Sequence, residues 1–306
     1  MSASPVTARS EDAARLRAPR RSEAPLLLLA PALAVVGVLF GGGLFLGGLQ
    51  ALGYLPGAGM SALSLAHVRR VVQDPDFGLS LLLTVYIGAG STLVAAGLSV
   101  PLALTLHACE RRRWLRFVFQ IPLTVPHLVV AIAVLFLLSP AGLLSRAAAA
   151  VGLIEGPAGF PLLVNDGWGI GIMAAYVWKE VPFITLMLLS VLARSGPELQ
   201  DVGRTLKAGR WQRFRCITLP IIFPSLAAAG LIVFAYTFGA FEVPFLLGRT
   251  HPMLLPVLAY RSYSDVDLMM RPEGIAAGLV IAALVAAAVV AGQGLAQAAR
   301  RRGAIL

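Results

Sequence analysis

Residues 79–108 read LSLLLTVYIGAGSTLVAAGLSVPLALTLHA, a run in which no aspartate, glutamate, lysine or arginine occurs. A helix needs roughly 20 apolar residues to cross the hydrocarbon core of a bilayer. The run is long enough for this, and the basic residues Arg111, Arg112 and Arg113 follow it closely. It therefore predicts a membrane-spanning helix with a basic flank.

Five further runs of similar character occur along the chain, at about residues 26–49, 115–138, 169–193, 221–247 and 274–293. The 306-residue chain is 58% hydrophobic and only 13% charged, whereas soluble domains carry about 25% charged residues. We therefore predict an all-α fold, a polytopic bundle of six transmembrane helices in the cytoplasmic membrane.

The predicted domain organisation follows from these runs. Residues 1–25 are rich in Ser, Ala, Pro, Arg and Glu, which favours a disordered tail. The run at 26–49 exceeds the apolar core of a secretory signal peptide, about 7–15 residues, so we interpret it as a retained first transmembrane helix. Residues 79–294 then form a core domain of five helices, and residues 295–306 form a second tail.

The distribution of basic residues predicts which side of the membrane each loop faces, because cytoplasmic loops carry an excess of lysine and arginine. With the N-terminus inside, eighteen of the 25 basic residues fall on the cytoplasmic side and six on the opposite side, and Lys179 lies within a span. This distribution predicts that both termini are cytoplasmic.

Several functional classes find no support in the sequence. The net charge of +10 comes from short arginine clusters between apolar runs, so nucleic-acid binding is not expected. Cys109, Cys216 and the four scattered histidines lack the spacing of metal ligands. Neither lysine lies in a Gly-x-x-x-x-Gly-Lys-Ser/Thr motif, so the chain has no phosphate-binding loop. We therefore predict a protein that is not an enzyme and holds no cofactor or metal.

The most informative hydrophilic segment is residues 194–220, RSGPELQDVGRTLKAGRWQRFRCITLP, between the fourth and fifth apolar runs. Pro197 and Glu198 suit a helix start, Gly209 suits a break, and apolar residues recur at helical spacing on both sides of it. We expect two short amphipathic helices joined by a turn. The pattern leaves two roles open, a helix pair lying on lipid headgroups or a docking site for a protein partner.

The same segment resembles the coupling loop of type I ABC-importer permeases, the binding-protein-dependent transport proteins. The signature of that family runs Glu-Ala-Ala, three residues, Gly, nine residues, Ile, one residue, Leu-Pro. Here Asp201-Val202-Gly203 stands in the Glu-Ala-Ala place, Lys207 stands in the Gly place, and Ile217, Leu219 and Pro220 match at the right spacing. The resemblance covers roughly residues 79–294.

The resemblance implies a role for this loop and a set of partners. It implies docking to a dimer of ATPase subunits that bind ATP, pairing with a second permease subunit in a homo- or heterodimer, and delivery of solute by an extracytoplasmic binding protein. The candidate coupling residues are Glu198, Asp201, Gly203, Leu206, Lys207, Gly209, Trp211, Phe214, Ile217, Leu219 and Pro220. Because Lys207 replaces the glycine of the family, we expect Gly209 to supply the turn.

Three charged residues fall inside predicted spans, Lys179 and Glu180 in the fourth and Glu242 in the fifth. Charges inside a bilayer are costly and usually face a cavity or a partner. They either line a translocation path, where acids favour a cationic solute, or pair internally, as Lys179 would with an acid on a neighbouring helix. We expect Pro182 and Pro244 to interrupt their helices.

The segment at 238–248, FGAFEVPFLLG, is similar to permeases for polyamines and related small solutes. The resemblance implies a polyamine such as spermidine or putrescine, with a sugar, a phosphonate or iron as alternatives in the same class. A stand-alone ion-coupled secondary transporter is a further alternative. A membrane-embedded enzyme is a weaker one, because the sequence shows no cluster of catalytic or metal-binding residues.

Overall fold

The computed structural model describes residues 24–108, 113–194 and 198–301. Within these ranges the side chains of 24–27, 113, 115–116, 198–200 and 295–301 are also left undescribed. The chain divides into two compact units, residues 1–49 and 50–306. The predicted tail at 1–25 therefore lies almost entirely outside the described residues.

The first unit holds one apolar helical stretch. It consists of α2 (Ala24–Val36), the π-helical turn η1 (Gly37–Gly41) and α3 (Gly42–Ala51), which ends just inside the second unit. Leu28–Ala51 is long and apolar enough to cross a membrane. The described side chains of α2 and η1 are all exposed, so no packing within the unit stabilises this part of the stretch.

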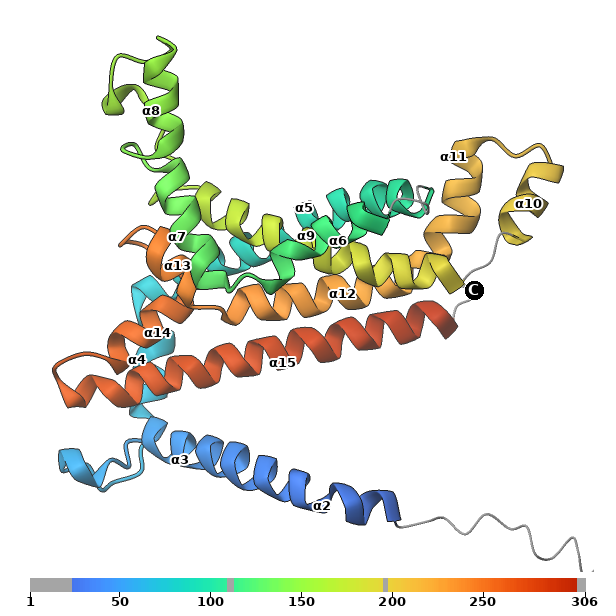
Figure 1. The fold of residues 1–306 in the computed structure, drawn as a ribbon. Coiled ribbons are helices and arrows are strands. Elements are labelled where there is room, and N and C mark those ends of the chain that lie inside the picture. Colours follow the sequence, from blue (N-terminus) through green and yellow to red (C-terminus); the bar gives the residue numbers. More distant parts are fainter. Residues whose placement is uncertain (1–23, 109–112, 195–197, 302–306) are drawn as a thin grey trace, which may run out of the picture. The chain divides into compact units, whose positions relative to one another are not determined.

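All regular secondary structure in the described part of the second unit is helical, apart from one isolated bridge between Leu55 and Met60. Its first half holds η2 (Pro56–Ala58), α4 (Ala66–Gln73), α5 (Pro75–Ala108), α6 (Arg113–Thr124), α7 (His127–Leu138), α8 (Leu143–Ala150), η3 (Pro157–Gly159) and α9 (Ile170–Arg194). Its second half holds α10 (Glu198–Thr205), α11 (Arg210–Arg213), η4 (Phe214–Thr218), α12 (Leu219–Gly239), α13 (Glu242–Leu247), α14 (Leu255–Tyr263), η5 (Leu268–Met270) and α15 (Arg271–Arg301). Figure 1 shows these elements.

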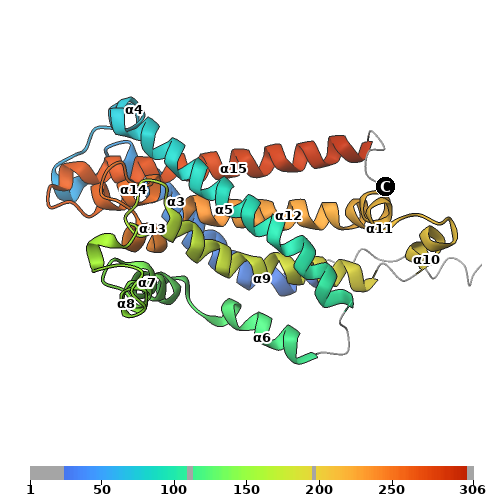
Figure 2. The ribbon, with the colours of Figure 1, turned by 90° about the horizontal axis from the view of Figure 1, so that it is seen from above.

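The centre of the second unit is formed by α5, α9 and α12, which pack against one another (Figure 2). Small residues lie at the contacts, among them Ala95 and Ser99 on α5 and Ala229 on α12, and all three are buried. Small side chains let transmembrane helices approach closely, and dispersion contacts then stabilise the bundle. Ser99 also donates a hydrogen bond to the carbonyl oxygen of Val181, which ties α5 to α9 at 3.1 Å.

Two buried polar side chains fix the ends of helices near α5. Asp166 accepts backbone N–H bonds from Trp168 and Ile170 and so satisfies free donors at the start of α9. Thr84 accepts the backbone N–H of Leu255 at 2.8 Å and thereby holds the start of α14 against α5. These contacts fix the start of α9 and hold the start of α14 against α5.

Among the described residues, six helical stretches are long and apolar enough to cross a membrane. This agrees with the predicted fold class. The third predicted run, 115–138, is nevertheless not one helix: α6 ends at Thr124, and α7 begins at His127 within a candidate span that extends to Ala150. Pro126 explains the break, because proline has no N–H to donate and excludes the preceding residue from helical geometry.

The fifth predicted run also differs from the structure. α12 ends at Gly239, so Glu242 lies beyond the candidate span Arg210–Gly239, in the first turn of α13. The expected interruptions at Pro182 and Pro244 were wrong. Pro182 lies within the continuous α9, and Pro244 lies in the first turn of α13, where its missing N–H costs little. The interruption lies between the end of α12 and the start of α13, at residues 240–241.

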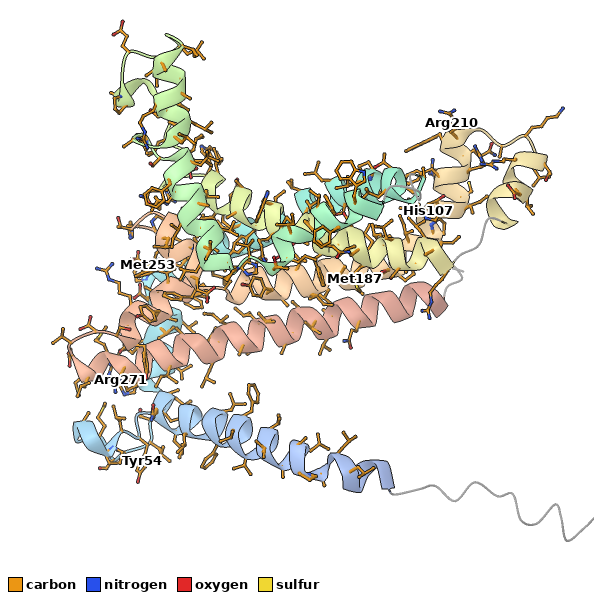
Figure 3. All side chains as sticks on the ribbon, in the orientation of Figure 1. Tyr54, His107, Met187, Arg210, Met253 and Arg271 are labelled. Atoms are coloured by element: carbon orange, nitrogen blue, oxygen red, sulfur yellow. The ribbon has the colours of Figure 1, made fainter. Side chains whose placement is uncertain are left out.

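The described parts of the segments of the second unit that are predicted to be cytoplasmic gather at one end of it. α10 and α11 stand at the same end as the last residues of α5 and α15, whereas α13, α14 and α4 lie at the other end (Figure 1). Figure 3 shows His107 and Arg210 at the first end and Met253 and Arg271 at the second. Within the second unit α5, α9, α12 and α15 therefore alternate in direction, whereas α7 and α8 stand away from them in this view (Figure 1). The sidedness of the two ends stays a prediction.

Candidate functional site

The loop at residues 194–220 forms two short helices, as predicted. α10 is followed by α11, and the chain then passes through the π-helical turn η4 directly into α12. Residues 195–197 are not described, and neither is the side chain of Glu198. Leu219 and Pro220 are the first two residues of α12, so the loop joins the transmembrane helix without a break.

The turn after α10 is made by Lys207, not by Gly209 as expected. Lys207 has a φ angle of 54°, in the left-handed region that glycine favours. Its N–H donates to the carbonyl of Arg204, and the N–H of Ala208 donates to the carbonyl of Gly203. These two bonds form a Schellman motif, the helix end that usually has glycine at the left-handed position. Gly209 instead has φ −63° and ψ 164° and precedes α11.

Gly203 brings the two helices of the loop together. A β-carbon built on Gly203 would lie 2.9 Å from Cδ1 of Ile217 and 3.1 Å from Cγ of Arg213. A side chain at this position would therefore displace Ile217 or Arg213. The contact joins the Asp201-Val202-Gly203 part of the signature to its Ile217 part, so the spacing in the sequence corresponds to packing within one unit.

The outer face of the loop is apolar and basic. Val202, Leu206 and Trp211 are 55%, 76% and 71% exposed. The ring of Trp211 packs on that of Phe214, with centroids 5.4 Å apart. Asp201 pairs with Arg204 at 3.0 Å on the exposed surface, where such a pair contributes little stability. Exposed apolar side chains of this kind suit a covering surface, which either lipid headgroups or a protein partner can supply.

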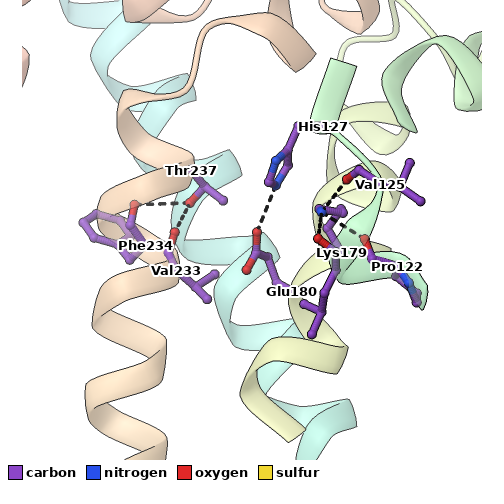
Figure 4. Close-up of polar contacts among 9 residues, drawn as sticks. Pro122, Val125, His127, Lys179, Glu180, Val233, Phe234 and Thr237 are labelled. Atoms are coloured by element: carbon purple, nitrogen blue, oxygen red, sulfur yellow. Dashed lines mark hydrogen bonds and ion pairs between the residues drawn. The ribbon is translucent and has the colours of Figure 1, made fainter. Parts of the chain in front are cut away.

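Lys179 is buried in α9 and is only 6% exposed. Its ammonium group donates to three backbone carbonyls, those of Pro122 at 2.9 Å, Leu123 at 3.3 Å and Val125 at 2.6 Å (Figure 4). Lys179 is thus paired internally, but with carbonyl oxygens at and just after the end of α6 and not with an acid on a neighbouring helix.

Glu180, the next residue, is also buried and lies near the start of α7. Its Oε1 is 3.3 Å from Nε2 of His127, the first residue of that helix. The imidazole of His127 packs against the ring of Tyr236 on α12, with centroids 4.6 Å apart. Sequence reasoning treated His127 as one of several scattered histidines. Its place directly after Pro126, inside an apolar run, was the signal that could have identified it.

Glu242 stands apart from this pair. It is exposed, and in the part of the chain with described side chains it forms no ion pair. On α9, the hydroxyl of Tyr176 is buried and has no hydrogen-bond partner in the described structure. Of the three predicted charges, Lys179 and Glu180 lie together at the break between α6 and α7, whereas Glu242 lies at the start of α13 without an ion-pair partner among the described side chains.

A separate hollow of about 570 Å³ lies at the opposite end from α10 and α11. Arg249, Tyr260, Arg261 and Asp265 are among the residues that line it. Its size falls in the range of small-molecule sites, and its two guanidinium groups suit an anion. No group of three or more metal-binding side chains occurs among the residues with described positions.

Comparison with known proteins identifies similar sequences. A sequence model of the family described as "Binding-protein-dependent transport system inner membrane component" matches residues 95–302. The inner membrane ABC transporter permease protein YnjC of Escherichia coli K12 is 28% identical over 232 residues, which cover 74% of this chain and 42% of YnjC. The molybdenum transport system permease protein ModB of Mycobacterium tuberculosis is 26% identical over 226 residues, 73% of this chain and 81% of ModB. The chain therefore spans less than half of one relative and most of the other.

A solved structure has the same fold. A chain of a bacterial ABC transporter involved in the import of the acidic polysaccharide alginate aligns with a TM-score of 0.75 and 20% identity. The alignment covers 94% of the present chain and 98% of that one. A likeness at this identity concerns the fold alone.

Proposed function

Because this chain belongs to the family of binding-protein-dependent transport system inner membrane components, we propose that it is the permease subunit of an ATP-binding-cassette importer in the cytoplasmic membrane. It moves a small polar solute inward, while a separate subunit binds and hydrolyses ATP. A second permease and an extracytoplasmic solute-binding protein complete the assembly. In such an importer the solute moves only when the ATPase works, which distinguishes this proposal from a stand-alone ion-coupled transporter.

The observation that carries this proposal is the folded loop between α9 and α12. Its signature residues pack through Gly203 and Ile217, and its exposed face presents Leu206 and Trp211. The loop joins α12 without a break at Leu219, so a force applied to it by an ATPase is transmitted directly into a transmembrane helix. A helix pair on lipid headgroups would give no reason for this continuity.

Reconstitution tests the proposal. The chain is purified with its co-expressed partners and placed in liposomes, and uptake is measured with ATP enclosed on the loop side. We expect uptake only with ATP and only with an active ATPase subunit. Uptake by the chain alone, driven by an ion gradient, would contradict the proposal and support a secondary transporter.

For the solute we propose a polyamine-type cation. Glu242 supports this, since an exposed carboxylate without an ion-pair partner among the described side chains favours a positively charged ligand over an anion. Glu180 adds less support than the sequence suggested, because it is already paired with His127. Uptake of radiolabelled putrescine that unlabelled spermidine inhibits is the expected result.

An oxyanion is the second candidate, and a different observation favours it. The hollow beside Arg249 and Arg261 suits an anion, and one relative is a molybdenum transport permease. Uptake of radiolabelled molybdate or sulfate in the same liposomes, without uptake of putrescine, would replace the polyamine proposal by this one. A sugar, a phosphonate and iron complete the competition panel.

A further inference from the structure

The break between α6 and α7 leaves backbone groups without helical partners. The last four carbonyls of a helix have no intrahelical donor, and proline at 126 cannot donate to any of those at the end of α6. Within a bilayer each such group must be satisfied inside the protein or by water in a cavity. The carbonyl of Pro122 accepts the N–H of Val125 at a long 3.4 Å, so the structure needs a donor above all at Leu123 and Val125.

Lys179 meets this need completely. An ammonium group has three donors, and here all three have a carbonyl acceptor within 3.3 Å. The positive charge also lies at the carboxyl end of α6, where the helix dipole is negative. A buried lysine is normally costly, but this one is both fully hydrogen-bonded and placed in a favourable field.

Glu180 places a negative charge at the other side of the break, at the start of α7. It pairs with His127, the first residue of α7, so a carboxylate lies near the amino end of that helix, where the dipole is positive. Two adjacent residues of α9 therefore hold two consecutive half-helices, as Figure 4 shows.

Interrupted helices in ion-coupled transporters leave carbonyls that coordinate a sodium ion or a proton-carrying group. We propose that Lys179 and Glu180 are positioning residues that close the α6–α7 break from within, with the lysine ammonium in the place of a coupling ion. The carbonyls at the break then have hydrogen-bond donors without any bound cation, and α6 stays fixed along α9 while solute is moved. The uptake arm of the test below rests on the proposed function, and its unfolding arm does not.

Chemical rescue tests the clamp. In Lys179→Ala the carbonyls of Leu123 and Val125 lose their donor, and that of Pro122 keeps only the long bond from the N–H of Val125. The purified complex should therefore unfold at a temperature lower by about 5 °C or more. Methylammonium fits the vacated space and can donate to the same carbonyls, so it should restore most of the loss. Tetramethylammonium has no N–H and should restore none. Wild-type protein should respond to neither.

A second variant guards against misfolding of the first. Lys179→Gln keeps most of the side-chain volume and two donors, so it should be intermediate in stability and should not respond to methylammonium. Ser190→Ala, at an exposed position on the same helix, is the matched control and should match the wild type. Equal unfolding temperatures of Lys179→Ala and wild type, or equal rescue by the two ammonium ions, would overturn the clamp.

Transport gives an independent readout. Uptake by complexes containing Lys179→Ala should fall about tenfold and recover with methylammonium, and wild-type uptake should be unchanged when choline replaces sodium. Sodium-dependent wild-type uptake would overturn the proposal that the lysine replaces a coupling ion. If uptake never depends on an ATPase, the proposed function fails, while the unfolding measurements still decide the clamp.

Discussion

At the scale of single residues, Lys207 shows how much stability the loop loses because a residue other than glycine occupies the left-handed position of its turn. A non-glycine residue in the left-handed region costs about 1–2 kcal/mol, whereas glycine costs about 0.5–1 kcal/mol in lost backbone freedom. Lys207→Gly should therefore stabilise the complex by about 0.5–1 kcal/mol. Denaturant or thermal unfolding of the purified complex measures this gain. Lys207→Val should have the opposite effect, and equal stability of all three proteins would contradict the strained turn.

Glu242 carries a separate residue-scale prediction about the solute. Glu242→Gln removes a charge and keeps the shape of the side chain, so the concentration of putrescine for half-maximal uptake should rise about fivefold, equivalent to about 1 kcal/mol. Glu155→Gln removes an exposed acid in the loop before α9 and serves as the control. A similar loss in both variants, or none in either, would argue against a cation-binding role for Glu242.

At the scale of elements, the close approach of α10 to η4 depends on Gly203. Valine there would overlap Ile217 and Arg213, and overpacking of this kind costs about 1–3 kcal/mol. We expect Gly203→Val to reduce copurification of the ATPase subunit while the chain still inserts into the membrane. Gly97→Val is the control, because a β-carbon there meets nothing within 4 Å. ATPase binding that is unaffected by Gly203→Val would count against the loop as the docking element.

A second element-scale prediction separates surface charge from packing in the same loop. Asp201→Arg should also weaken ATPase association, because it reverses an exposed charge in the signature, but it should leave the unfolding temperature nearly unchanged. Gly203→Val should change both. The two variants together distinguish a docking contact from a fault in the fold of the loop.

Elements were predictable from sequence where one run of apolar residues makes one helix. α5 and α9 lie within a few residues of their predicted bounds for this reason. The predictions of one helix at 115–138 and one at 221–247 were wrong, because hydropathy does not reveal a break between two apolar helical segments. The break at Pro126 was readable in principle, but the lysine that makes it tolerable comes from α9, more than fifty residues later, and only the fold brings the two together.

At the scale of the whole molecule, the orientation in the membrane decides which end meets an ATPase. Cys216 lies on the loop and is exposed, whereas Val266, 99% exposed, lies at the opposite end of the second unit. In a Cys109→Ser background, a membrane-impermeant maleimide should label Cys216 only in inverted vesicles. With Cys216→Ser and Val266→Cys added, it should label only intact cells. The opposite pattern would place the loop outside, where no ATPase has access, and would refute the coupling role together with the cytoplasmic termini.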